Sequence, residues 1–156
     1  MFKRVAESLS HNPISDVEAH CDGPCGVYDP AAARITAEAV VSMTKKILAL
    51  QVPDTGDAKA MAAYHNTLSR YIAIKEEQAE LTKHELLVLW TDFFKPQHLE
   101  QFPNLHDVFW NAAKECSYAK QEVSLHHAQN VLDACKQIHE MFWAAKGREV
   151  PWYTAS

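Results

Sequence analysis

A run of twelve residues near the start of the chain, AHCDGPCGVYDP at positions 19–30, concentrates side chains that bind metals or react. His20 offers an imidazole, Cys21 and Cys25 offer thiols, and Asp22 lies between the two cysteines. The cysteines stand four positions apart, so their sulfur atoms meet at one ion only if the chain turns back on itself. Two glycines and a proline within the run permit such a turn. The run therefore predicts a compact loop with two thiols facing one site.

The number of local ligands decides which metal this loop would suit. Structural zinc takes four side-chain ligands, and only three are present here. If the chain began at His20, its free amine and the amide nitrogen of Cys21 would join the two thiolates in a square plane. Such a plane suits Ni(II) or Cu(II), and its strong donors also stabilise Ni(III), which favours one-electron chemistry on a small molecule. A plain thiol pair and a transient zinc site remain alternatives at this level.

The bulk properties exclude several other classes of function. The chain has 156 residues, which fits one domain, and its net charge of -5 argues against a nucleic-acid binder. No apolar run approaches the roughly 20 residues of a membrane helix. Residues 1–19 carry Lys3 and Arg4 but are interrupted by polar residues, so they do not predict a secretory signal. We expect a cytoplasmic protein in which residues 1–19 are either a tail or a pro-segment.

The rest of the chain predicts an all-α fold. Apolar residues recur at three- and four-residue spacing over about 30–50, 58–93, 104–119 and 122–146, and no stretch shows the alternation of a strand. Asp29 and Pro30 are typical of a helix start, and Ile35 and Val40 are expected on the buried face of the first helix. Short connections indicate an antiparallel four-helix bundle with the metal-binding loop at its N-terminal end. The other two cysteines, Cys116 and Cys135, are expected to be buried small apolar residues.

The order of residues in the loop resembles the nickel hook of the nickel-containing superoxide dismutases. The similarity runs from His20 through Tyr28 and continues into Asp29-Pro30. A second similar stretch begins at Ile74-Lys75-Glu76 and continues to Leu-Trp-Thr-Asp-Phe-Phe-Lys-Pro at 89–96. The resemblance extends from His20 to about residue 143, nearly the whole of the chain that follows the leader.

This resemblance implies a nickel ion bound by the His20 amine, the Cys21 amide nitrogen and the thiolates of Cys21 and Cys25. The His20 ring joins as an axial ligand in the oxidised state. Asp22 and Tyr28 shape the catalytic pocket, in which superoxide is converted to dioxygen and hydrogen peroxide by a Ni(II)/Ni(III) centre. The resemblance further implies that a maturation protease removes residues 1–19, that residues 20–156 form the mature domain, and that six subunits assemble as a homohexamer.

Some positions depart from the family pattern. Thr36 and Gln78 stand where better-known members have an acid and an arginine that steady the axial imidazole, and Glu38 or Glu77 are candidate replacements. Phe93 stands where a tyrosine is found. Because superoxide is an anion and the chain is net negative, we expect local attraction by Lys95, Lys83 or the amides of the hook.

Two rival hypotheses use the same cysteines. One is a non-catalytic module that stores or senses zinc or nickel, and the other is a thiol–disulfide switch on a helical scaffold. Neither rival needs a free amine on His20, whereas the dismutase hypothesis does.

Overall fold

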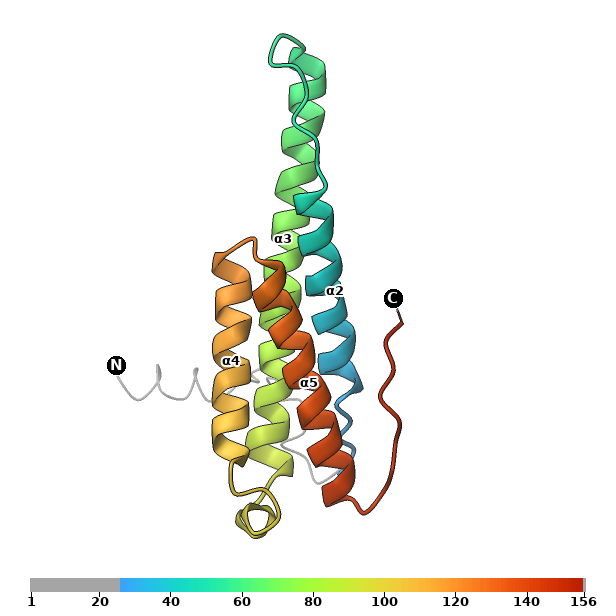
Figure 1. The fold of residues 1–156 in the computed structure, drawn as a ribbon, viewed down its shortest axis with the longest axis vertical. Helices are drawn as coiled ribbons and strands as arrows, with labels where there is room; N and C mark the ends of the chain where they lie inside the picture. The colour runs from blue at the N-terminus through green and yellow to red at the C-terminus, as the bar shows by residue number, and fades with distance from the viewer. Residues whose placement is uncertain (1–25, 156) are drawn as a thin grey trace, which may run out of the picture.

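Four antiparallel helices run side by side in the computed structural model, which describes residues 26–155 (Figure 1). They are α2 (Ala31–Leu48), α3 (Ala58–Val88), α4 (Leu105–Gln121) and α5 (Leu125–Ala145). A π-helical turn, η1 (Leu89–Phe93), extends α3, and a short 3-10 helix, η2 (Pro96–Leu99), precedes α4. Each helix packs against the next, and α5 closes the ring against α2. The predicted four-helix fold is confirmed, and residues 26–155 contain no strand.

The helix ends follow the local capping chemistry, with small shifts from the prediction. Pro30, rather than Asp29, is the residue before the first helical position, and the Asp29 carboxylate accepts the Ala31 N–H at 2.8 Å. The fourth helix was expected to start at 122 but starts at Leu125, because Ser124 has extended backbone angles and its hydroxyl accepts the His127 N–H at 3.3 Å. Gly147 ends α5 with a φ of 64°, a conformation that favours glycine.

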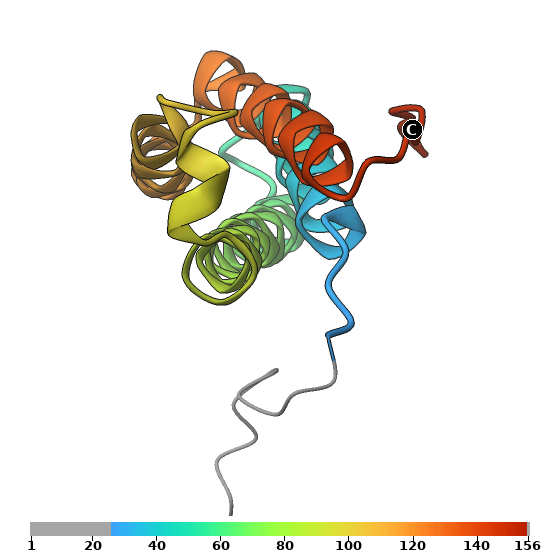
Figure 2. The same ribbon diagram turned by 90° about the horizontal axis from the view of Figure 1, so that it is seen from below.

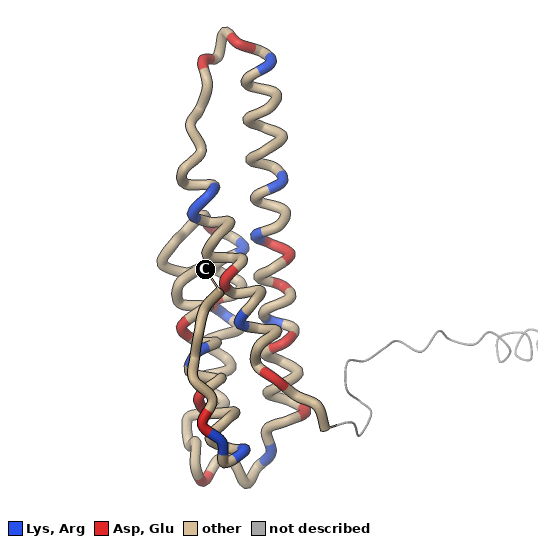
Figure 3. Tube along the Cα trace, turned by 90° about the vertical axis from the view of Figure 1, so that its right-hand side faces the viewer, with Lys and Arg blue, Asp and Glu red and all other residues tan. Residues whose placement is uncertain are grey.

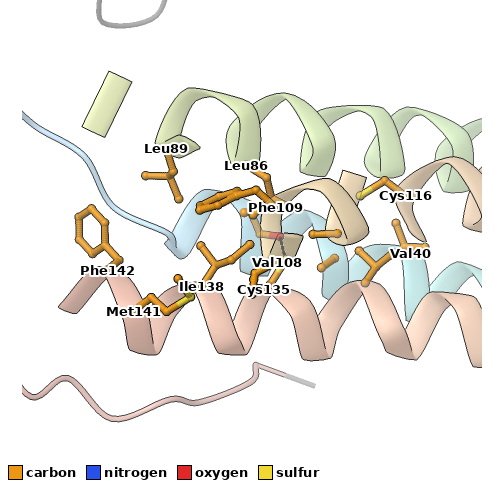
Figure 4. Packing of buried hydrophobic residues seen from close by; sticks show 14 of the residues in the cluster. Val40, Leu86, Leu89, Val108, Phe109, Cys116, Cys135, Ile138, Met141 and Phe142 are labelled. Atoms are coloured by element: carbon orange, nitrogen blue, oxygen red, sulfur yellow. Dashed lines mark hydrogen bonds between the residues drawn. The ribbon is translucent and has the colours of Figure 1, made fainter. Parts of the chain in front are cut away.

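The core lies along the axis between the four helices (Figure 4). It is filled by side chains from all of them, including Val40, Leu86, Val108, Phe109, Val131, Ile138 and Phe142. Cys116 is 0% exposed and Cys135 is 1% exposed, which confirms that the bundle cysteines behave as buried apolar residues.

The predicted buried face of the first helix was partly wrong. Val40 is buried as expected, but Ile35 is 57% exposed. The buried face instead carries Ala33 and Ala37, together with Thr44. Helix α2 packs against both α3 and α5, and the small alanine side chains allow both neighbours to approach closely. The narrow space between these helices is therefore filled by alanine side chains, and the larger isoleucine lies outside it.

Two extensions stand out from the bundle. The last turn of α2, the non-helical connection 49–57 and the N-terminal half of α3 project beyond the ends of α4 and α5 as an arm, residues 45–72 (Figures 1 and 3). The buried residues of α3 begin only at Lys75, so the arm contributes little to the core. At the other end, residues 148–155 run back along the outer side of α2 and α5 without regular secondary structure (Figures 1 and 2).

The C-terminal segment, residues 148–155, is held by polar contacts to both helices. The carbonyl oxygen of Val150 lies 2.8 Å from Nε2 of His139 on α5. The guanidinium of Arg34 on α2 lies 4.3 Å from the ring centroid of Tyr153. Arg34 also forms a buried ion pair of 2.5 Å with Glu38, whose second carboxylate oxygen accepts the Ala155 N–H at 2.7 Å. These contacts fix the segment against the first turns of α2.

Candidate metal centre and pocket

The predicted metal-binding residues lie before the described part of the chain. His20, Cys21, Asp22 and Cys25 are all outside residues 26–155. The described chain starts at Gly26, whose φ of 68° lies in the left-handed region that favours glycine. A turn that requires glycine therefore follows directly after Cys25.

A pocket of about 440 Å³ opens beside this turn. One wall comes from the segment that leads into α2, and the opposite wall comes from η1, η2 and Lys95 between them. The lining residues are Gly26, Tyr28, Asp92, Phe93, Lys95, Gln97 and His98. Because Gly26 is bonded to Cys25, the pocket starts one residue away from a predicted thiolate ligand. The structure thus places Tyr28 in the wall of this pocket, with its ring centroid 5.8 Å from that of Phe93.

The π-helical turn shapes the far wall of the pocket. The sequence predicted a helix through Phe93, and the helical stretch does extend that far, but its last turn is wider than an α-helical turn. The N–H of Phe94 donates to the carbonyl oxygen of Leu89 at 3.0 Å, which is an i to i−5 bond. Phe93 then packs 4.3 Å from the ring centroid of Phe142, while Phe94 packs 5.4 Å from that of Phe109. The wide turn therefore lets two consecutive aromatic residues both face the interior.

The charges around the pocket are of both signs. Lys95 and Asp92 line it directly. The ammonium group of Lys146 lies 5.6 Å from the ring centroid of Phe93, so a second positive charge stands behind the aromatic wall. Lys83, the other lysine considered for attracting an anion, is not among the lining residues and approaches Ser117 at 3.4 Å instead. No sequence pattern pointed to Lys146, because its proximity to Phe93 depends on the packing of α5 against η1.

Thr36 and Gln78, the two positions that depart from the family pattern next to the expected axial imidazole, lie close together. The hydroxyl oxygen of Thr82 on α3 is 2.8 Å from the hydroxyl oxygen of Thr36 on α2 and 2.8 Å from the carbonyl oxygen of Gln78. The contact between α2 and α3 at this level is thus made by neutral groups. Glu38 and Glu77 were the candidates to replace the missing charged groups. Glu38 already binds Arg34 and the C-terminal segment, and Glu77 is exposed.

The described helices offer no competing metal site. Within residues 26–155 no group of three or more histidine, cysteine or acidic side chains is arranged to hold a metal ion. Burial raises the pKa of Cys116 to about 12 and that of Cys135 well above its ordinary value, so both thiols stay protonated. None of the described helices is both long and apolar enough to span a membrane.

A four-helix bundle preceded by the donor-rich run 20–25 places this chain in the class of helical-bundle metalloproteins. The family model described as nickel-containing superoxide dismutase matches residues 15–146, and the chain belongs to this family. Its activity is the dismutation of superoxide, and its cofactor is nickel.

Relatives and solved structures agree with this assignment. The chain is 43% identical over 134 residues to the nickel superoxide dismutase of Streptomyces seoulensis and 41% identical over 134 residues to that of Streptomyces coelicolor. Each alignment covers 86% of this chain and 93% of the relative. A crystal structure of nickel-containing superoxide dismutase with ligation corresponding to the oxidised state has a TM-score of 0.71 and 43% identity, covering 82% of this chain and 99% of the other.

Proposed function

We propose that the amine and imidazole of His20, the amide nitrogen of Cys21 and the thiolates of Cys21 and Cys25 would hold the nickel ion. The single observation that carries this proposal is the pocket that starts at Gly26, because it lies one residue from Cys25 and is closed on its far side by η1 and η2. The lack of a competing cluster within residues 26–155 supports the same ligand set.

Removal of residues 1–19 is part of this proposal. In an uncleaved chain the nitrogen of His20 is a peptide amide rather than an amine, so the ligand set is incomplete. We propose that a maturation protease cuts before His20 and leaves residues 20–156 as the mature domain. The family match begins at residue 15, five residues before His20, which supports a precursor form among the relatives as well.

The reaction consumes two superoxide anions and two protons and yields one dioxygen and one hydrogen peroxide. Nickel supplies the exchange of one electron with each superoxide anion. The residues of the pocket admit and orient the substrate: the Lys95 ammonium attracts the anion, and Tyr28, packed against Phe93, borders the space it enters. Phe93 contributes an apolar side chain to the pocket lining, and we propose that Asp22 also shapes the pocket.

Local charge offsets the negative charge of the whole chain. The net charge is -5, which repels an anion at long range. Lys95 lines the pocket that superoxide must enter, and the ammonium group of Lys146 adds a second positive charge 5.6 Å from the ring centroid of Phe93. A local positive field of this kind raises the association rate and weakens as salt is added.

We also propose that the chain acts in the cytoplasm as a homo-oligomer, specifically a hexamer. Exposed Ile35 on α2, together with exposed Ile74 and Leu81 on α3, supports an interface between subunits, because such apolar side chains gain stability when a neighbouring subunit covers them.

The decisive experiment compares two nickel-loaded chains, one starting at His20 and one with a single alanine before His20. Superoxide consumption and bound nickel are measured for both. We expect only the first chain to be active, because only it has the free amine. If both chains are active, the amine is not a ligand. If both chains bind nickel without activity, the metal-storage hypothesis explains the protein better. If neither chain binds nickel, the thiol–disulfide switch explains it better.

A further inference from the structure

We propose that His98 is a catalytic residue of the pocket, donating a hydrogen bond from Nε2–H to superoxide as it approaches the metal. This inference rests on the proposed function, because it needs the metal to lie beside this pocket. The hook is bonded to one wall of the pocket through Gly26, and His98 belongs to the opposite wall. A small anion that enters between the two walls therefore meets His98.

A pair of hydrogen bonds within η2 fixes which ring nitrogen carries the proton. The N–H of Lys95 donates to Nδ1 of His98 at 3.0 Å, and the N–H of His98 donates to the carbonyl oxygen of Lys95 at 2.9 Å. A nitrogen that accepts a hydrogen bond cannot also carry a proton, so the ring is neutral at Nδ1 and protonated at Nε2. Within residues 26–155 the ring makes no other hydrogen bond, so Nε2–H is the polar atom left for a ligand.

The ring is also held by aromatic contacts on two sides. It stacks on Phe93 with centroids 5.7 Å apart and an interplanar angle of 14°. Phe94 meets it edge to face, with centroids 5.5 Å apart. A donor that is fixed before the substrate arrives costs little reorganisation when the substrate binds, which is the general advantage of a preorganised site.

The other residues that η1, η2 and Lys95 between them contribute to the pocket wall are less suited to this task. Lys95 and Gln97 are exposed and have long, rotatable side chains, and Phe93 has no polar atom. The Asp92 carboxylate accepts hydrogen bonds and repels an anion. Among the lining residues from η1 and η2, His98 is therefore the donor with a fixed direction. Lys95 brings the anion near by charge, and His98 orients it.

Two substitutions separate donation to substrate from support of the loop. His98→Asn keeps an acceptor oxygen near the position of Nδ1 and removes the donor at Nε2. His98→Gln keeps an N–H donor near the position of Nε2 and removes the acceptor at Nδ1. If His98 acts on substrate, the asparagine variant loses about tenfold in the second-order rate constant and the glutamine variant stays within about threefold of wild type, since a hydrogen bond to a charged group contributes at this scale.

The rate constants are measured on nickel-loaded chains that start at His20, with bound nickel determined for each. A purely structural role predicts the reverse order, with the asparagine variant active and the glutamine variant impaired, and that result would overturn the inference. Equal rates in all three chains would overturn it as well. If the wild-type chain itself is inactive, the proposed ligand set has failed instead.

An independent measurement needs no metal. ¹⁵N chemical shifts of the His98 imidazole in the nickel-free chain report which nitrogen is protonated. We expect a protonated Nε2 and an unprotonated Nδ1. Protonation at Nδ1 with Nε2 unprotonated would show that Nε2 has no hydrogen to donate, and the inference would be wrong even if the variants lost activity.

Discussion

Replacing Lys75 with methionine tests how α3 is joined to the C-terminal end of α4. Lys75 on α3 is 1% exposed, and its ammonium group donates to three carbonyl oxygens at the end of α4: Ala119 at 2.5 Å, Lys120 at 2.9 Å and Glu122 at 3.0 Å. The last carbonyls of a helix lack partners within the helix and carry partial negative charge. A buried lysine from another helix thus supplies the donors that α4 itself cannot.

The size of the effect follows from these three bonds. A hydrogen bond that involves a charged group contributes about 1.5–3 kcal/mol net. Against this stands the cost of burying the ammonium group, which also lowers the pKa of Lys75. Methionine has a similar volume and avoids that cost, but it leaves the carbonyl oxygens unpaired. We therefore expect Lys75→Met to lower the free energy of unfolding by about 3 kcal/mol, close to the cost of breaking a buried ion pair.

The matched control is Lys83→Met, eight positions further along α3. Its ammonium group makes one long contact of 3.4 Å with Ser117, so we expect a change within about 0.5 kcal/mol. Denaturant unfolding gives both values at one protein concentration, and hydrogen exchange of the Glu122 amide reports the end of α4 directly. If the two variants are equally stable, or if exchange at Glu122 is unchanged in Lys75→Met, the account of Lys75 as a tertiary cap is refuted.

Four further results are expected. Because burial raises the pKa of Cys116 to about 12, a thiol reagent at pH 8 should modify only the two hook cysteines of the folded metal-free chain, and modification of all four would contradict the packing. The folded chain keeps the Cys116 proton that the unfolded chain loses above pH 9.0, so the free energy of unfolding should fall as pH rises from 9 to 12, a slope that Cys116→Ala should reduce. Lys95→Gln should lower the rate of superoxide consumption about three- to tenfold at low salt and flatten its dependence on ionic strength, whereas an unchanged salt dependence would show that the attraction lies elsewhere. Tyr153→Ala should release the C-terminal segment and remove the protection of the Ala155 amide from hydrogen exchange, while Tyr153→Phe, which keeps the ring over Arg34, should preserve it.

The sequence was most informative where the relevant residues are neighbours along the chain. The helices follow from local spacing and caps, and their prediction is confirmed. The donor set of the hook lies within six positions, so it could be proposed from the sequence, and it stays a prediction. The pocket could not be predicted, because its far wall, between Asp92 and His98, joins Tyr28 only through the fold. His98 is one of nine histidines, and nothing in its local sequence marks it as a fixed donor.

Two other features depend on packing in the same way. Ile35 was expected inside and lies outside, because α2 uses its alanines to contact two neighbouring helices at once. The π-helical turn at Leu89–Phe93 arises from the packing of consecutive aromatic residues against different helices, which a spacing rule based on the regular α-helix does not anticipate.

The projecting arm has a practical consequence for handling the protein. A tag fused before His20 would block or be lost with the proposed cleavage, and a tag fused after the last residue would begin beside Ala155, whose amide is bound to Glu38. The turn at the tip of the arm, residues 51–57, is almost entirely exposed and far from the pocket (Figure 1). An affinity tag or a fluorescent label inserted beside Gly56 would therefore leave both chain ends in their native chemistry.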